Sequence, residues 1–171
     1  MLMSRTVKFA LTFAAGALVA LSAVVAAAPR MLIEEHQSAF AIDETVERLS
    51  DAAKAEGWTV AGVRKLDENI AKNGGPRLRP VRIVELCQPH YAGALLEEDE
   101  NGRLSAMMPC TISVYEKSDG RAYVAAFNVS LLGPLLGGKA ANVFEKSVAP
   151  DQEAILRSVR TAPPLRGDRS Q

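Results

Sequence analysis

The chain has 171 residues, which is enough for one domain with short appendages. Lys and Arg together number 20, as do Asp and Glu, so the formal net charge is zero. Aromatic residues make up only 5% of the chain. Because it has no basic excess and few aromatic residues for base stacking, the chain is not expected to bind nucleic acid.

Residues 9–28 form an uncharged stretch of 20 residues, FALTFAAGALVALSAVVAAA, and Arg5 and Lys8 precede it. As a helix, this stretch would be about 30 Å long, which matches the hydrocarbon thickness of a bilayer. We expect residues 1–30 to be a membrane anchor, and a cleaved signal segment is the alternative. The two basic residues favour a cytoplasmic N-terminus. The domain is therefore expected at the bacterial inner membrane, facing the periplasm, or exported if the segment is cleaved.

The clearest amphipathic helix lies at AIDETVERLSDAAKAEGW, residues 41–58. Val46, Leu49 and Ala53 recur at helical spacing, which predicts one buried face. Asp43 is expected to cap the first turn. A short strand at 31–36 is expected before this helix.

The next segments read as a strand at WTVAGVRKL (58–66) and a short helix at DENIAKNGG (67–75), with Asp67 as its expected cap. VRIVELC (81–87) predicts a strand, after which Gln88 and Pro89 begin a helix. Strand alternation separates two sets of side chains, with Val81, Ile83, Glu85 and Cys87 on one face and Arg82, Val84 and Leu86 on the other.

CTISVYE (110–116) and RAYVAAFN (121–128) are two strand patterns, and the KSDG between them is typical of a hairpin turn. Helical patterns follow from Val129, and residues 161–171 have the composition of a disordered tail. The order of elements predicts an α+β fold. We expect one largely antiparallel sheet with helices packed on one face, preceded by an N-terminal hydrophobic helix.

The chain resembles the domain of unknown function 302 (DUF302) family over about residues 31–160. The similarity is carried by FAIDETVERL (40–49), VRIVELCQPHYA (81–92), MMPCTISVYEKSDGRAYVAAFN (107–128) and SLLGPLLGG (130–138). Family members often have ELCNP where this chain has ELCQP. The resemblance implies a small α+β domain that forms homodimers, and some members carry an N-terminal membrane segment. It implies no biochemical activity.

The chain has two cysteines, Cys87 and Cys110, each at an end of a predicted strand. If these strands are antiparallel neighbours, the two ends meet; if they are parallel, the ends lie apart. An even cysteine number in an exported protein favours a disulfide. Such a bond would close a loop of 24 residues and contribute roughly 3 kcal/mol. Two unbonded core thiols are the other structural interpretation.

A soft metal site is a second hypothesis. Cys87, His90 and Cys110, joined by Met107 or Met108, offer thiolate, imidazole and thioether ligands. This set suits copper(I), or zinc without the methionines. Glu85 precedes Cys87 by two residues on the same strand face and is a candidate charge partner.

The leading functional interpretation is a binding module for a small ligand, a soft metal or a partner protein. Its candidate site consists of Glu85, Cys87, His90, Met108 and Cys110. A thiol-dependent enzyme or redox protein is one alternative, and a purely structural dimeric domain is another. The other histidine, His36, is interpreted as a surface or packing residue.

Overall fold

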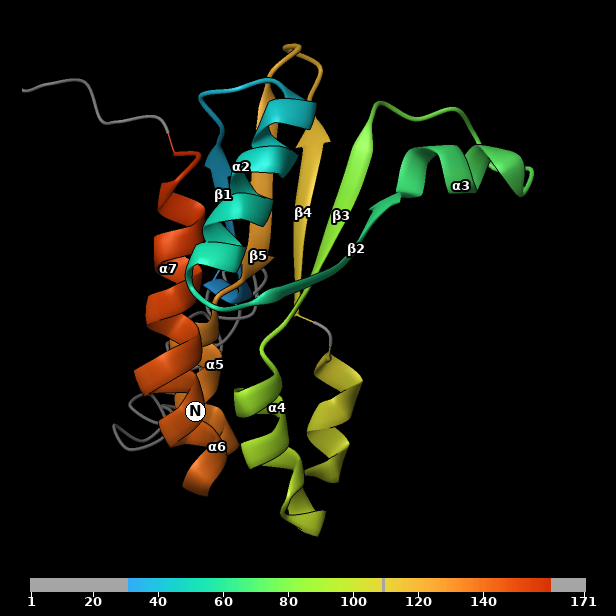
Figure 1. Ribbon diagram of the computed structural model, residues 1–171. Coiled ribbons are helices and arrows are strands. Elements are labelled where there is room, and N and C mark those ends of the chain that lie inside the picture. Colours follow the sequence, from blue (N-terminus) through green and yellow to red (C-terminus); the bar gives the residue numbers. More distant parts are fainter. Residues whose placement is uncertain (1–30, 109, 161–171) are drawn as a thin grey trace, which may run out of the picture.

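The computed structural model describes residues 31–108 and 110–160 (Figure 1). Its centre is an antiparallel sheet of five strands in the order β1–β5–β4–β3–β2. The predicted α+β class and antiparallel sheet are confirmed, while the predicted N-terminal helix and C-terminal tail lie outside the described residues. The strands are β1 (Ile33–Gln37), β2 (Thr59–Lys65), β3 (Val81–Cys87), β4 (Cys110–Glu116) and β5 (Ala122–Phe127).

The helices do not all cover one face of the sheet. Helices α2 and α7 lie over one face, α3 projects beside the β2–β3 edge, and the other helices gather beyond one end of the sheet (Figure 1). The helical segments are α2 (Ile42–Ala55), α3 (Leu66–Lys72), α4 (Pro89–Leu96), η1 (Asp99–Met107), α5 (Val129–Leu136), α6 (Gly138–Val143), η2 (Phe144–Val148) and α7 (Ala149–Arg157).

Helix α2 packs its predicted apolar face onto the sheet. Leu49 and Ala53 are fully buried, and Val46 packs against the same core. The prediction that Asp43 caps this helix is wrong, because the helix already begins at Ile42. Asp43 instead lies inside the first turn, where its negative charge suits the positive end of the helix dipole.

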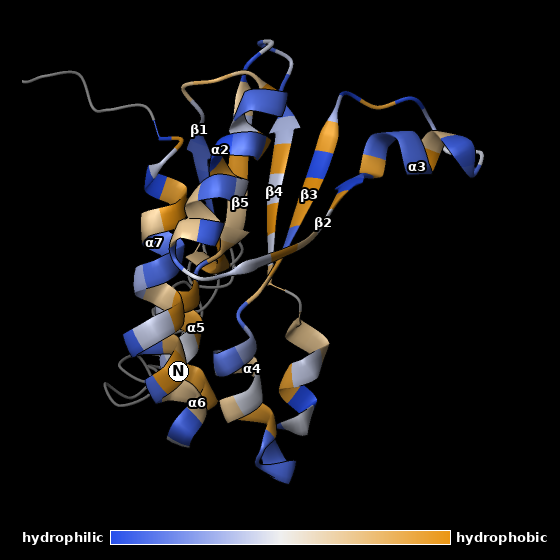
Figure 2. Ribbon diagram, in the orientation of Figure 1, coloured by the Kyte–Doolittle hydropathy of each residue, from blue (hydrophilic) through white to orange (hydrophobic). Residues whose placement is uncertain are grey.

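The predicted alternation is confirmed for residues 83–86 of β3, whereas Cys87, predicted on the face of Glu85, lines a cavity with core residues at the end of the strand. Val84 and Leu86 are buried under the helices, while Ile83 and Glu85 lie half-buried on the opposite face. Figure 2 shows β3 as a largely apolar strand interrupted by hydrophilic bands. The core face of the sheet continues through Ile112 and Val114 on β4 and Val124 on β5.

The predicted hairpin joins β4 to β5, but neither strand lies at an edge. Strand β1 pairs with β5, and β3 pairs with β4, so the free edges of the sheet belong to β1 and β2. The hairpin turn uses Gly120 at a φ of 74°, a conformation that suits glycine.

Asp67 does not cap α3, contrary to the prediction. The helix begins one residue earlier, at Leu66, and the Asp67 carboxylate accepts hydrogen bonds from the Val81 amide (3.2 Å) and Arg82 Nη1 (2.5 Å). Both members of the Asp67–Arg82 pair are 13% exposed. Burial alone would raise the pKa of Asp67, but the Val81 hydrogen bond and the Arg82 charge hold that pKa below its usual value.

Candidate functional site

The two cysteines lie at neighbouring strand ends. Strand β3 ends at Cys87, strand β4 begins at Cys110, and the two strands are antiparallel, with Leu86 opposite Cys110. The structure thus selects the first of the two predicted arrangements, in which the ends meet. Both cysteines are half-buried free thiols, and the disulfide stays a prediction.

A small cavity opens beside these strand ends, with a volume of about 40 Å³. That is room for roughly three water-sized spheres, so the cavity can take an ion or a small group rather than a large ligand. Its wall is almost entirely apolar and contains four sulfur-bearing side chains. The lining residues are Trp58, Cys87, Gln88, Tyr91, Ala92, Leu95, Leu104, Met107, Met108, Cys110, Phe144 and Val148.

Local sequence explains how the chain turns around this cavity after Cys87. Gln88 caps α4, as predicted, by accepting a hydrogen bond from the His90 amide (2.8 Å). Pro89 occupies the first helical turn, where a missing N–H costs nothing. Helix α4 then presents Tyr91 and Leu95 to the cavity wall.

The two methionines follow η1 on the return path to β4. The Met108 amide donates to the Ser105 carbonyl (3.0 Å), which ends the helical segment just before the strand. Met108 packs against the core, whereas Met107 remains 39% exposed. Because both residues line the cavity, Met107 marks the side on which it meets solvent.

An aromatic pair, Trp58 and Tyr91, forms part of the cavity wall. Trp58 is 6% exposed, and its Nε1 donates to Asp151 Oδ2 at 2.9 Å. The Tyr91 ring meets the Trp58 ring edge-on, with centroids 6.0 Å apart. Burial, followed by the hydrogen bond to Asp151, raises the pKa of Tyr91, so its hydroxyl stays protonated. Sequence reasoning missed this wall, because Trp58 and Asp151 are 93 residues apart and no local pattern links them.

The surroundings of Cys110 favour its neutral thiol. Burial, and then the nearby Cys87, raise the pKa of the Cys110 thiol above its ordinary value. A neutral thiol is a poor nucleophile, since the thiolate is the reactive form. A ligand that needs the Cys110 thiolate must therefore displace its proton.

Two of the predicted site residues lie away from the cavity. His90 is exposed at the start of α4, and only its backbone amide takes part in the cap. Glu85 lies on the uncovered face of the sheet, where it forms an ion pair with Arg64 of β2. Among the residues that the structure describes, no group of three or more His, Cys, Asp or Glu side chains is placed to hold a metal ion. The structure therefore brings together Cys87, Cys110 and both candidate methionines, Met107 and Met108, and leaves out Glu85 and His90.

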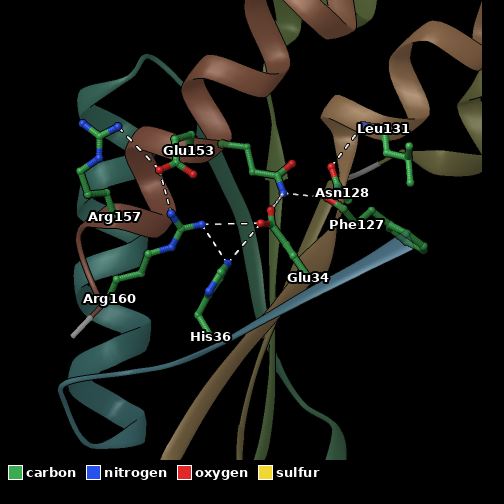
Figure 3. Close-up of polar contacts among 9 residues, drawn as sticks. Glu34, His36, Phe127, Asn128, Leu131, Glu153, Arg157 and Arg160 are labelled. Carbon is green, nitrogen blue, oxygen red and sulfur yellow. Dashed lines mark hydrogen bonds and ion pairs between the residues drawn. The ribbon is translucent and has the colours of Figure 1, made fainter. Parts of the chain in front are cut away.

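A separate polar cluster surrounds His36 on β1 (Figure 3). His36 Nε2 lies 2.9 Å from Arg160 Nη2 and 3.2 Å from Glu34 Oε2, and Arg160 also contacts Glu153 at 2.7 Å. This cluster ties β1 to the end of α7. It agrees with the interpretation of His36 as a packing residue, because His36 contacts both Glu34 and Arg160 within the cluster.

A family model described as "Domain of unknown function DUF302" matches residues 34–159. The chain belongs to the DUF302 family. A search of curated proteins found no match. Among solved structures, the chain is similar to the crystal structure of an uncharacterized conserved DUF302 protein from Bacillus stearothermophilus. The two share 24% identity with a TM-score of 0.66, over 76% of this chain and 99% of the other. At that identity the similarity supports the fold alone and gives no information about activity.

The expected membrane anchor at residues 9–28 lies outside the described residues. Within residues 31–108 and 110–160, none of the helices combines the length and the hydropathy needed to cross a bilayer.

Proposed function

We propose that this DUF302 domain is a membrane-anchored, extracytoplasmic binding module and that copper(I) is the ligand of its sulfur-lined cavity. The observation that carries this proposal is the convergence of Cys87, Met107, Met108 and Cys110 on one small apolar cavity. Thiolate and thioether sulfurs are soft ligands that select copper(I) over harder ions. We place the domain on the periplasmic side of a bacterial inner membrane.

Zinc fits this cavity less well than copper(I). Structural zinc sites take four ligands from cysteine, histidine and carboxylate side chains. Only two of the lining residues, Cys87 and Cys110, belong to that set, and His90 is outside the cavity. The methionine thioethers supply the remaining donors only for a softer ion.

The test is anaerobic competition for copper(I) between the full chain and a chromogenic chelator. We expect one copper(I) per chain, and we expect Cys87→Ser and Cys110→Ser each to weaken binding on the order of 100-fold or more. That estimate follows because even outer-shell changes at metal sites cost about 10–100-fold. The matched controls are His90→Ala and Glu85→Gln, which change exposed or ion-paired groups outside the cavity. Equal copper binding by the cysteine variants and the wild type would refute the proposal.

A thiol redox protein is the second candidate, because the two thiols lie at adjoining strand ends. A count of free thiols in the exported chain distinguishes the two functions. The chain is denatured and alkylated, and mass spectrometry gives the number of modified cysteines. Two modified thiols support metal binding, whereas none supports a Cys87–Cys110 disulfide. A thiol enzyme using a Cys–His pair is disfavoured, because His90 does not line the cavity.

The homodimer implied by the family resemblance stays a prediction. The face of the sheet that carries Ile83, Thr111 and Ser113 is a surface available for it, because α2 and α7 lie over the opposite face. Sedimentation equilibrium of the detergent-solubilised chain tests the dimer directly.

A further inference from the structure

One end of the domain exposes an unusual concentration of apolar side chains. The described structure exposes nine large hydrophobic residues, and five of them lie at this end: Met31, Leu32, Ile33, Phe127 and Leu135. Leu135 is 74% exposed, Met31 53%, Phe127 52% and Ile33 47%. Exposed apolar surface of this kind marks a place of contact with a partner or a membrane. We call these five residues the apolar end.

The residues of the apolar end come from neighbouring segments. Ile33 pairs with Phe127 across β1 and β5, and the Asn128 amide donates to the Leu32 carbonyl at 2.9 Å. Asn128 then caps α5, the helix that carries Leu135. Figure 1 shows α5 just beyond the end of β5, and Figure 2 shows its apolar colouring.

The same segments carry no charge. Residues 127–138 contain no Asp, Glu, Lys or Arg, and neither do residues 31–33, in a chain that is 23% charged. Helix α5 nevertheless leaves Leu135 in contact with solvent instead of burying it. Such a surface loses little when it leaves water, because no charged group has to be desolvated.

The chain itself indicates what covers this surface. Two residues, Pro29 and Arg30, link the uncharged segment 9–28 to Met31, the first residue of the described domain. At no more than about 3.6 Å per residue, this linker keeps Met31 within roughly 11 Å of the end of the segment. If residues 9–28 span the bilayer, the apolar end is held at the lipid surface.

We propose that the apolar end rests in the lipid interface, with Leu135, Phe127 and Met31 inserted among the headgroups. The proposal rests on the membrane anchor in the proposed function, and it adds a second, peripheral contact made by the folded domain. Interfacial apolar side chains of this kind reach about 5–10 Å into the headgroup region. The docked domain then holds a fixed orientation above the membrane instead of swinging on its linker.

The neighbouring charges predict how the contact responds to lipid charge. Lys139, which follows α5, is paired with Glu97 and Glu98, and Asp99 and Glu100 continue that acidic stretch. The five residues of the apolar end are uncharged, and a single basic residue, Arg30, adjoins Met31 in the sequence, whereas basic membrane-binding segments carry roughly four to eight. The contact is therefore mainly apolar. We therefore expect no gain from anionic lipid, unlike a basic membrane-binding segment.

The experiment places an environment-sensitive dye on single cysteines of the full chain, reconstituted in phosphatidylcholine vesicles with nitroxide-labelled lipid. Cys87→Ser and Cys110→Ser provide the background, and circular dichroism checks that it is folded. The dye is attached at Leu135→Cys, at Val63→Cys as the exposed control on β2, and at Ala15→Cys within the apolar segment. A repeat at Phe127→Cys supplies a second position at the apolar end.

We expect strong lipid quenching at positions 15, 135 and 127, at least about threefold above position 63, with no increase when anionic lipid is added. Quenching at position 15 combined with values at 135 and 127 equal to position 63 would overturn the docking while leaving the anchor intact. No quenching at position 15 would overturn the anchor, and the docking with it. A dye that is shielded at position 135 without lipid quenching would assign the surface to a second copy or to another part of the chain, which also overturns the proposal.

Discussion

The two ends of strand β3 differ in the chemistry and the partners of their side chains. At its start, Arg82 forms an ion pair with Asp67, and the Asp67 carboxylate also accepts a hydrogen bond from the Val81 amide. At its end, Cys87 lines an apolar cavity beside Cys110 of the neighbouring strand. Charged groups taken out of water require a partner, whereas thiols tolerate an apolar cavity without one. The charged side chains at the first end therefore stabilise the fold, whereas the sulfur atoms at the second end are available to bind a ligand.

The largest expected effect lies at the first end. Asp67→Ala leaves the Arg82 guanidinium without its carboxylate, and we expect the free energy of unfolding to fall by about 3 kcal/mol. Urea denaturation of the chain measures this change. Copper(I) affinity of the folded variant should remain that of the wild type. A loss of affinity without a loss of stability would contradict the division between the two ends.

Acid should weaken the same pair. Because the folded pKa of Asp67 lies below its ordinary value of 3.8, the stabilisation is complete above that value and is lost as the pH falls through the folded pKa. Asp67→Asn has no carboxylate to titrate there, so its stability should fall less steeply between pH 5 and pH 2. If stability fell equally steeply with pH in the wild type and in Asp67→Asn, the Asp67–Arg82 pair would not contribute to acid sensitivity.

At the second end of β3, a higher pH favours ligand binding, just as it favours the Asp67–Arg82 pair at the first end. The raised pKa of Cys110 keeps its thiol protonated at neutral pH, so binding a metal releases that proton. We expect apparent copper(I) affinity to rise about tenfold per pH unit for each proton released, between pH 6 and pH 8. Competition titrations at several pH values give the slope. An affinity independent of pH would exclude Cys110 as a thiolate ligand.

The methionines provide a finer test of the sulfur set. Met108→Leu keeps the volume and the apolar character of the side chain, so stability should change by less than about 1.5 kcal/mol. Copper(I) affinity should fall about tenfold, equivalent to about 1.4 kcal/mol. Met107→Leu serves as the comparison at the solvent-facing side. Unchanged affinity in both variants would leave only the two cysteines as ligands.

The smallest expected effect concerns the supporting wall. Trp58→Phe removes the hydrogen bond to Asp151 while keeping a ring in place, and should cost about 1 kcal/mol of stability. Thermal unfolding measures this loss. Copper(I) affinity should change less than in Met108→Leu, because Trp58 supplies no sulfur ligand. A larger affinity loss than in Met108→Leu would make the ring part of the site.

Sequence reasoning succeeded where the signal was local. Alternation along residues 81–87 gave the buried face of β3, and Gln88 followed by Pro89 gave the start of α4. It failed where a distant partner decided the outcome. Asp67 resembles a helix cap, but Arg82, 15 residues later, engages its carboxylate.

The candidate site divides in the same way. That Cys87 and Cys110 meet depended on the relative direction of β3 and β4, which the chain order left open. His90 was grouped with Cys87 by its spacing of three residues. The turn into α4 instead leaves its side chain exposed, a direction that spacing alone does not determine.

The most direct test of the copper(I) site is X-ray absorption at the copper edge of the anaerobically loaded full chain. The sulfur-lined cavity predicts a first shell made of sulfur alone, without imidazole scattering, and the same spectrum in His90→Ala. A nitrogen shell that disappears in His90→Ala, or a chain that retains no stoichiometric copper, would contradict it.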